Sequence, residues 1–527
     1  MRGSAFALAI VLWGAGCSPT ATGGSAPPHE LRIADLTDPS SLDPLLAHDQ
    51  DTIGFDLLFV QTLVGLSADN RLVPVLTVRV PSRANGDISP DGRTITYRLR
   101  RGVRFADGQP LTSADVAFTF AAIMDARNPV LSRDAYSRVQ SLSTPDASTV
   151  IVRLRHPWNA AVGELFAQSD FAFGILPKHA FTSTFLQHAP WEDRAFGTGP
   201  FRVTQWRRGD RVVLEPNPYF SPRPKLARIE LRMIPDPITA FDALRAGEVD
   251  LTDITAGMVP EARSLGGLRT VATAVNGMNY LALQTGAAPA SDLRVRQAIA
   301  DALDVEEIER TFHGLYPRAA AFLPPVLAWH DRTIAPISHD AARAARELDA
   351  AGWELNRGIR MKHGVSLDVV FVGVAGPLAQ SESIAVQSEL AAAGIRTTIK
   401  LSPATTFFAP EGPLRTGQFT MSDQQWIGGA DPEQTVEFAC SQIGPDGVNV
   451  TRFCDRRFEA AFADQAVAAD DGRRARDFIA MQRVVRERLP LIPLHYITNF
   501  DVIGRRVSGF ARNMLEYPVG VENWDAR

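Results

Sequence analysis

Three cysteines are the residues of this chain with the most distinctive chemistry: Cys17 near the N-terminus, and Cys440 and Cys454 near the C-terminus. Neither Cys440 nor Cys454 has a partner at the C-x-x-C spacing typical of zinc sites, so the sequence does not support a structural metal. A thiol can instead accept a lipid, form a disulfide or stay free. For Cys440 and Cys454 the sequence leaves two possibilities open, a disulfide between them or two unpaired thiols.

Other residues capable of catalysis lack the spacing that enzyme motifs require. The sequence contains no G-x-S-x-G and no H-E-x-x-H motif, and its ten histidines are scattered. Gly197-Thr198-Gly199 lacks the third glycine and the lysine of a nucleotide-binding loop, and predicts a tight turn before a strand. We therefore expect a protein that is not an enzyme and that needs no cofactor and no metal. An exported hydrolase is the less favoured alternative.

The N-terminus has the pattern of an export signal. Arg2 precedes a short apolar run, Ala5 to Trp13, and small residues lead to Cys17. Because a bilayer span takes about 20 residues, residues 1–17 predict a signal peptide rather than a membrane helix. A cysteine after small residues resembles the bacterial lipoprotein signal, although Gly14 stands where that pattern usually has leucine. The resemblance implies that Cys17 accepts a lipid; an ordinary cleaved signal is the alternative.

Composition narrows the class of protein further. Residues 18–29 are mostly small residues, Gly and Pro, and predict a flexible tether. The chain has 45% hydrophobic and 21% charged residues, which is ordinary for a globular protein. A formal net charge of −5 gives no electrostatic basis for binding nucleic acid. We expect an exported, lipid-anchored body in the periplasm or at the outer face of the cell membrane.

Hydrophobic periodicity predicts an α/β protein. Ile95, Tyr97 and Leu99 alternate on one face of a strand, and Thr112 with Asp115 forms a capping box at the start of a helix. Residues 52–64 are apolar at helical spacing. Beyond residue 290, helices alternate with strands, which favours a partly parallel sheet; the helices are expected at 292–303, 378–393, 456–468 and 473–488, and the strands at 367–371 and 396–401. We expect two lobes with a boundary near residues 271–280.

Several segments together resemble one protein family. Residues 91–120, DGRTITYRLRRGVRFADGQPLTSADVAFTF, resemble the signature of family 5 extracellular solute-binding proteins, the dipeptide- and oligopeptide-binding components of bacterial ABC importers. Further segments follow in the order of that family: SLDP at 41–44, FGTGPFRVTQW at 196–206, NPYF at 217–220, NGMNYLAL at 276–283, RVRQAIADALD at 294–304, AAGW at 350–353, LPLIPL at 489–494 and VSGF at 507–510.

The resemblance implies a fold and a division into domains. It implies a two-lobed, three-domain fold of the type II periplasmic binding proteins, with a ligand cleft between the lobes. The core domain of lobe 1 is expected to comprise residues 30–50, 190–270 and 498–527, its extra domain residues 51–189, and lobe 2 residues 271–497. The chain is expected to cross between the lobes near residues 271–279 and again near residues 495–501.

The resemblance also points to ligand contacts. In peptide-binding members, an acidic residue shortly after a tryptophan pairs with the α-amine of the ligand. The corresponding segment, WIGGADPEQTVEF at 426–438, has Trp426, but Gly429 stands at the usual place of the acid. Asp431 either takes over that role or forms a turn cap before Pro432; alternatively, the ligand lacks a free α-amine. Further ligand contacts are predicted at the lobe crossing, where Asn279 and Tyr280 offer polar groups.

The predicted function follows from these observations taken together. We expect a monomeric binding protein that captures di- or oligopeptides and delivers them to an ABC permease and ATPase complex. A non-peptide solute is the main alternative, for example a metal chelate, an oligosaccharide or an opine-like compound. No nucleic-acid partner is expected.

Overall fold

The computed structural model describes residues 28–527 except 48, 170–171, 187–194, 311–313, 445–446 and 469. For residues 377–378 and 434–436 it describes the backbone but not the side chains. The predicted signal peptide, Cys17 and residues 18–27 of the predicted tether lie outside the described residues. Among the described residues, none of the helices has both the length and the hydropathy needed to cross a membrane.

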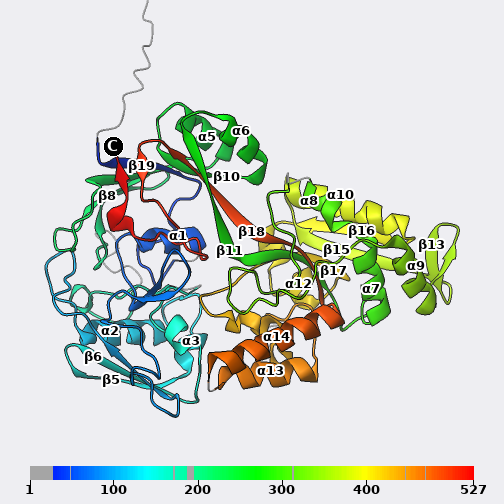
Figure 1. Cartoon of the computed structure of the whole chain (residues 1–527), viewed down its shortest axis with the longest axis horizontal. Coiled ribbons are helices and arrows are strands. Elements are labelled where there is room, and N and C mark those ends of the chain that lie inside the picture. Colours follow the sequence, from blue (N-terminus) through cyan, green and yellow to red (C-terminus); the bar gives the residue numbers. More distant parts are fainter. Residues whose placement is uncertain are drawn as a thin grey trace, which may run out of the picture.

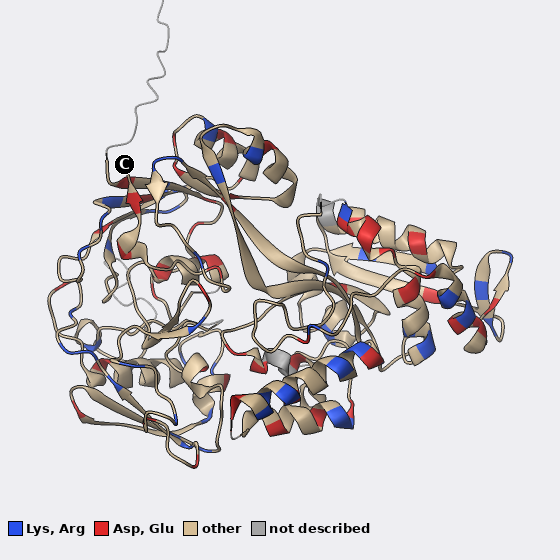
Figure 2. Cartoon of the chain, viewed as in Figure 1, with Lys and Arg blue, Asp and Glu red and all other residues tan. Residues whose placement is uncertain are grey.

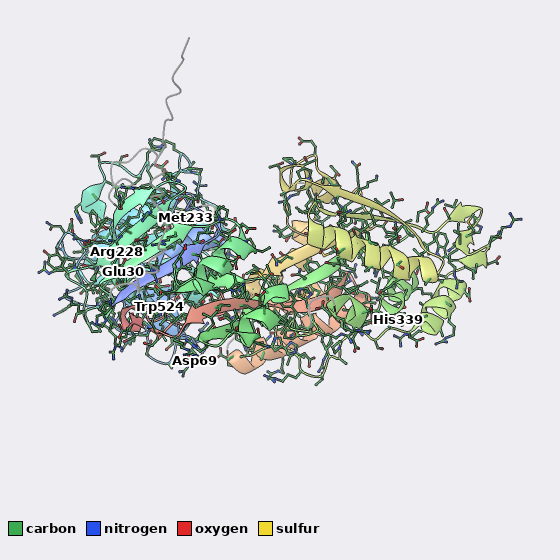
Figure 3. All side chains as sticks on the ribbon, turned by 90° about the horizontal axis from the view of Figure 1, so that it is seen from above. Glu30, Asp69, Arg228, Met233, His339 and Trp524 are labelled. Carbon is green, nitrogen blue, oxygen red and sulfur yellow. A yellow bond between two sulfur atoms is a disulfide. The ribbon has the colours of Figure 1, made fainter. Side chains whose placement is uncertain are left out.

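One ten-stranded mixed sheet extends through both lobes. Its strands, in spatial order, are β16 (Arg396–Ser402), β15 (Asp368–Val374), β17 (Met421–Ile427), β11 (Leu268–Leu283), β18 (Leu491–Gly504), β10 (Leu251–Ile254), β1 (Glu30–Asp35), β9 (Arg228–Met233), β8 (Arg211–Pro216) and β7 (Phe201–Arg207). Strand β1 is parallel to β9 and β10, and β15 is parallel to β16 and β17, whereas the other pairs are antiparallel. Figure 3 labels Glu30 and Arg228, which face each other where β1 and β9 begin. The expected α/β class with a partly parallel sheet is confirmed.

Lobe 1 and its extra domain form the body on the left of Figure 1. A continuous apolar core joins them, since Leu31 and Leu231 of the large sheet belong to the same cluster as Tyr97 and Phe166 of the extra domain. The remaining elements of this body are α1 (Gln50–Asp56), β2 (Val64–Leu66), β3 (Leu72–Pro74), β4 (Thr94–Arg98), α2 (Ser113–Met124), α3 (Asp134–Ser137), β5 (Val139–Asp146), β6 (Thr149–Leu154), α4 (Ala161–Glu164), η1 (Lys178–Ala180), α5 (Pro237–Arg245), η3 (Ala256–Met258), α6 (Val259–Ser264), β19 (Val507–Ser508), η6 (Val521–Asn523) and β20 (Asp525–Ala526).

Lobe 2 forms the body on the right of Figure 1 and has a separate apolar core, which includes Leu281, Ile299 and Phe371. Its other elements are α7 (Leu293–Ala302), α8 (Val305–Arg310), α9 (Ala341–Ala350), β12 (Glu354–Asn356), β13 (Ile359–Lys362), β14 (Val365–Ser366), α10 (Pro377–Ala392), α11 (Ala404–Phe407), α12 (Pro413–Thr416), η4 (Pro432–Phe438), η5 (Cys440–Gln442), α13 (Arg456–Ala466) and α14 (Asp471–Arg488).

The long strands β11 and β18 run from one lobe into the other (Figure 1). Their pairing is interrupted between Ala274 and Met278, so one part of the ladder belongs to lobe 1 and the other to lobe 2. Gly277 lies in the interruption, and a Cβ atom there would come within 2.7 Å of the carbonyl oxygen of Trp426, so only glycine allows this close approach. A break in two paired strands between two bodies is a natural position for a hinge.

The expected helix over residues 52–64 is wrong in its length. Helix α1 ends at Asp56, and β2 begins at Val64. The carbonyls of Leu58 and Phe59 accept the backbone N–H groups of Phe201 and Gly199, at 3.1 and 2.9 Å, instead of continuing the helix. A Cβ atom at Gly199 would lie 2.5 Å from the carbonyl carbon of Phe59, which explains a glycine at this crossing.

Candidate functional site

A cavity of about 880 Å³ lies between the two lobes. Lobe 1 lines it with residues 69–72, 80–83 and 159–163, and lobe 2 with residues 325–329, 430–432 and the start of α14. Pockets that bury small ligands have volumes of roughly 300–1,000 Å³. The size and the position between two lobes make this cavity the candidate binding site.

A buried ion pair forms one wall of the cavity. Both carboxylate oxygens of Asp431 accept hydrogen bonds from the guanidinium of Arg474, each at 2.6 Å. The Nε of Arg474 also donates to the side-chain oxygen of Gln465 at 3.0 Å. The side chains of Arg474 and Asp431 are only 6% and 11% exposed, so each charge is neutralised by its partner rather than by water.

An aromatic surface supports this ion pair. The guanidinium carbon of Arg474 lies 4.9 Å from the ring centre of Trp329, which itself stacks on Phe478 with ring centres 5.2 Å apart. The backbone of this loop is fixed as well, because Gln482 donates to the carbonyl of Trp329 at 2.8 Å. Trp329 thus presents a large half-buried ring, which can contribute apolar contact area to a ligand at a small loss of side-chain entropy.

Charged side chains of both signs line the cavity. The basic residues are Arg71, Arg83 and Arg332, and the exposed acidic residues are Asp69, Asp470 and Asp471. Arg71 and Asp69 pair with each other at 2.7 Å. Figure 2 shows residues of both charge signs interspersed along α14, and Figure 3 labels Asp69 at the edge of the body formed by lobe 1 and its extra domain. The cavity therefore suits a ligand that has both positive and negative groups.

Of the predicted ligand contacts, only Asp431 lines this cavity. Trp426 is 5% exposed and packs in an apolar cluster with Met278. The carbonyl of Gly429 accepts a hydrogen bond from the side-chain amide of Asn276 at 2.7 Å. Trp426 and Gly429 therefore have structural contacts in this arrangement, and their roles as ligand contacts stay predictions.

The two residues predicted at the lobe crossing lie in β11 and do not line the cavity. The side-chain oxygen of Asn279 accepts from Gln425 at 3.3 Å, on the neighbouring strand β17. Tyr280 is buried, and burial raises the pKa of its hydroxyl well above the usual value. Their proposed contacts with a ligand also stay predictions.

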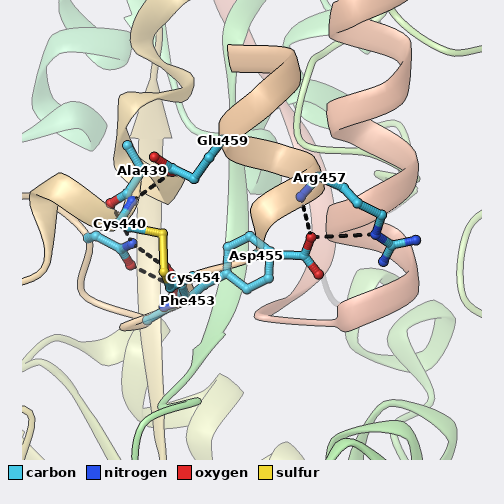
Figure 4. The surroundings of a disulfide bond; sticks show 9 residues. Ala439, Cys440, Phe453, Cys454, Asp455, Arg457 and Glu459 are labelled. Atoms are coloured by element: carbon cyan, nitrogen blue, oxygen red, sulfur yellow. Dashed lines mark hydrogen bonds and ion pairs between the residues drawn. A yellow bond between two sulfur atoms is a disulfide. The ribbon is translucent and has the colours of Figure 1, made fainter. Parts of the chain in front are cut away.

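Cys440 and Cys454 form a disulfide, with their Cα atoms 4.8 Å apart (Figure 4). The backbone N–H of Cys440 donates to Glu459 of α13 at 2.8 Å. Asp455, next to Cys454, caps the same helix by accepting the N–H of Arg457 at 2.8 Å. The disulfide therefore ties the segment after the cavity wall to the start of α13.

Several residues of this site were not foreseen from the sequence. Trp329 follows a proline-rich stretch, and a tryptophan in a predicted loop is a usable signal for a binding surface. Arg474 and Arg332 give no such signal, because Arg474 meets Asp431 only through the folding of segments 43 residues apart.

No group of three His, Cys, Asp or Glu side chains within the described residues is arranged to hold a metal ion.

A smaller cavity of about 160 Å³ lies within lobe 1 and is lined by Asp35, Asp253, Arg512 and Glu516. Burial raises the pKa of Asp35 to about 6, and it also raises the pKa of Asp253 and of Glu516. The residues that line this cavity all come from one lobe, so movement of the lobes would not enclose a ligand there.

Comparison with known proteins places this architecture in a family. Residues 72–442 match the model of bacterial extracellular solute-binding proteins, family 5. Di/tripeptide-binding protein 2 of Pseudomonas aeruginosa is 26% identical, over 92% of this chain and 93% of the relative.

Two solved structures show the same fold. The oligopeptide-binding protein AppA of Bacillus subtilis, in complex with a nonapeptide, is 21% identical, with a TM-score of 0.77 over 94% of this chain and 99% of that chain. NikA of Brucella suis, in complex with Fe(III)-EDTA, is 24% identical, with a TM-score of 0.81 over 94% of this chain and 100% of that chain. The chain therefore belongs to the family 5 extracellular solute-binding proteins, the non-enzymatic binding components of bacterial ABC importers.

Proposed function

We propose that this protein binds short peptides in the cavity between the lobes and delivers them to an ABC permease. The observation on which this depends is the cavity itself, which both lobes line and which has an aromatic wall and charges of both signs. A short peptide is a zwitterion with apolar side chains, so it can use all three features. The relatives named for di- and tripeptides and for oligopeptides support the same class of ligand.

Arg332 is the proposed contact for the carboxylate of the peptide. It is exposed, lines the cavity from lobe 2, and has no ion pair among the described residues. A guanidinium can bind a carboxylate through two parallel hydrogen bonds. Asp431 is not available to the amine of the peptide, because Arg474 already donates hydrogen bonds to both of its oxygens. The acidic group for the amine is instead supplied by Asp470 and Asp471, at the N-terminus of α14.

Calorimetric titration with di- and tripeptides tests this proposal. Arg332→Ala is expected to weaken the binding of free peptides about tenfold or more, since a charge-assisted hydrogen bond contributes about 1.5–3 kcal/mol. The same peptides with amidated C-termini should bind the variant and the unchanged protein equally. Arg346→Ala, at an exposed position of α9, is the matched control. An absence of heat with every peptide would contradict the proposal.

An anionic metal chelate is the second candidate ligand. Three arginines, Arg71, Arg83 and Arg332, line the cavity, and they suit a ligand with several carboxylates. The structural similarity to NikA, solved with Fe(III)-EDTA, adds support. Titration with Fe(III)-EDTA in the same calorimeter distinguishes the two, because a peptide site should give no heat with the chelate.

We also propose that Cys17 is lipidated, which would hold the protein at the membrane beside the permease. The support is the sequence pattern before Cys17 and the extracellular family. Metabolic labelling with radioactive palmitate tests it: the unchanged protein should take up label, and Cys17→Ala should not.

A further inference from the structure

The extra domain of lobe 1 directly contacts lobe 2 beside the cavity. The contacts come from two short segments of the extra domain, around Arg138 at the end of α3 and around Trp158 and Asn159 before α4. They meet the start of η4 and the end of α13 in lobe 2. In Figure 1, α3 and α13 face each other across the lower part of the junction.

Asn159 caps the C-terminal end of a helix that belongs to the other lobe. Its side-chain amide donates to the carbonyls of Gln465 and Ala468, both at 3.0 Å. Its backbone N–H donates to the carbonyl of Ala466, also at 3.0 Å. The last carbonyls of an α-helix have no partner within the helix, so a donor from outside satisfies them.

A second group of contacts lies next to this cap. The indole N–H of Trp158 donates to a carboxylate oxygen of Glu433, which also pairs with Arg138 at 3.4 Å. The guanidinium of Arg138 lies 4.5 Å from the ring centre of Trp158. Trp158 is 7% exposed and Glu433 is 8% exposed, so their hydrogen bond is shielded from water, whereas the side chain of Arg138 is 47% exposed.

We propose that Asn159, Trp158 and Arg138 form a latch, which holds the two lobes closed without a ligand. The hydrogen bonds of Asn159 and Trp158 and the ion pair of Arg138 with Glu433 each join the extra domain to lobe 2, and each would break if the lobes opened. Asn159 and Ala468 also line the cavity, so the closed latch preforms one of its walls. This inference goes beyond the proposed function, since it holds for whatever solute the protein binds.

The latch has a defined effect on binding. If the binding-competent state is the closed one, the apparent dissociation constant equals the intrinsic constant divided by the closed fraction. Loss of the latch lowers the closed fraction. It should therefore raise the dissociation constant of every ligand by the same factor, whatever the chemistry of that ligand.

Small-angle X-ray scattering from the solute-free protein tests the latch without any ligand. Asn159→Ala is expected to increase the radius of gyration. Asn159→Asp, which has nearly the same shape, should increase it further, because its carboxylate would face the carbonyl oxygens of Gln465 and Ala468 at the negative end of the dipole of α13.

Asn128 provides the matched control. Its side-chain amide also donates to two backbone carbonyls, those of Ala122 at 2.8 Å and Thr184 at 2.7 Å, but both lie in the same domain as Asn128. Asn128→Ala should lower the melting temperature and leave the radius of gyration unchanged. The latch is refuted if both Asn159 variants scatter like the unchanged protein.

Discussion

The pairing of individual charges decides which residues are available to a ligand. Asp431 lies in the cavity wall, but Arg474 donates to both of its oxygens and is itself stacked on Trp329. The oxygen Oδ1 also accepts the backbone N–H of Glu433 at 3.0 Å. Asp431 therefore acts as a structural cap and counter-ion in this arrangement, and its removal should affect the fold before it affects recognition.

Asp431→Asn should destabilise the protein. Removal of one partner from a buried ion pair leaves the other charge uncompensated and costs about 3 kcal/mol or more. We expect a clearly lower melting temperature in differential scanning calorimetry. Asp471→Asn, at an exposed position lining the same cavity, should leave the melting temperature nearly unchanged. An unchanged melting temperature for Asp431→Asn, together with lost peptide affinity, would instead indicate that Asp431 binds the amine.

At the scale of residues, the sequence predicts a segment near the ligand but not how the side chains of that segment pair. The segment around Asp431 was expected at the ligand, and it lies in the cavity wall. The sequence leaves the function of Asp431 open between an amine contact and a cap before Pro432, and the hydrogen bond from the N–H of Glu433 fits the cap. Arg474 could not be foreseen, because nothing in its local sequence indicates a partner in a distant segment.

Among the elements, α13 and the segment before it are stabilised from both sides. The disulfide holds the N-terminal side of α13, where Cys440 also donates to Glu459 (Figure 4). Asn159 of the extra domain caps the C-terminal end. Helix α13 is therefore tied to the segment before it at its start and to the extra domain at its end.

The double variant Cys440→Ser and Cys454→Ser should be less stable than the unchanged protein. The disulfide joins residues 14 apart in sequence, and closing a loop of that length stabilises by about 3 kcal/mol on the chain-entropy model. We expect a lower melting temperature for the double variant, and the same decrease when the unchanged protein is treated with reductant. Equal melting temperatures with and without the disulfide would contradict this role.

Local patterns predict four of the helices of lobe 2, α7, α10, α13 and α14, and two of its strands, β15 and β16. The expected helix at 292–303 is α7, with Asp292 as its N-cap, and the expected strand at 396–401 is β16. The helix predicted over residues 52–64 ends early because of a contact with a distant segment. The carbonyls of Leu58 and Phe59 accept hydrogen bonds from the backbone N–H groups of Phe201 and Gly199, at the start of β7. Contacts between distant segments leave no periodicity to detect.

On the scale of the whole molecule, the latch makes closure dependent on pH. Burial raises the pKa of Glu433; Asp431 raises it too, whereas Arg138, Trp158 and Arg474 lower it. A carboxyl with a raised pKa in the closed state binds its proton more tightly there than when it is exposed. Its contribution to closure is therefore complete below the ordinary pKa of 4.5 and is lost as the pH rises through the raised value.

We predict that the radius of gyration of the solute-free protein increases as the pH rises from 4.5 through the raised pKa of Glu433. Glu433→Gln keeps an oxygen for the indole N–H of Trp158 but has no charge to bury, so its radius of gyration should stay constant over the same range. Glu354→Gln, at an exposed position on β12, should behave like the unchanged protein. A pH dependence that persists in Glu433→Gln would show that another group is responsible.

We propose that a solute binds between the two lobes, which close around it. A crystal structure of the protein with a peptide that binds in calorimetry tests this claim most directly. We expect electron density for the peptide in the cavity, in contact with Trp329 and Arg332 of lobe 2 and with the segment around Asn70 of lobe 1. Density on the outer surface of one lobe, with the cavity between the lobes filled only by solvent, would contradict it.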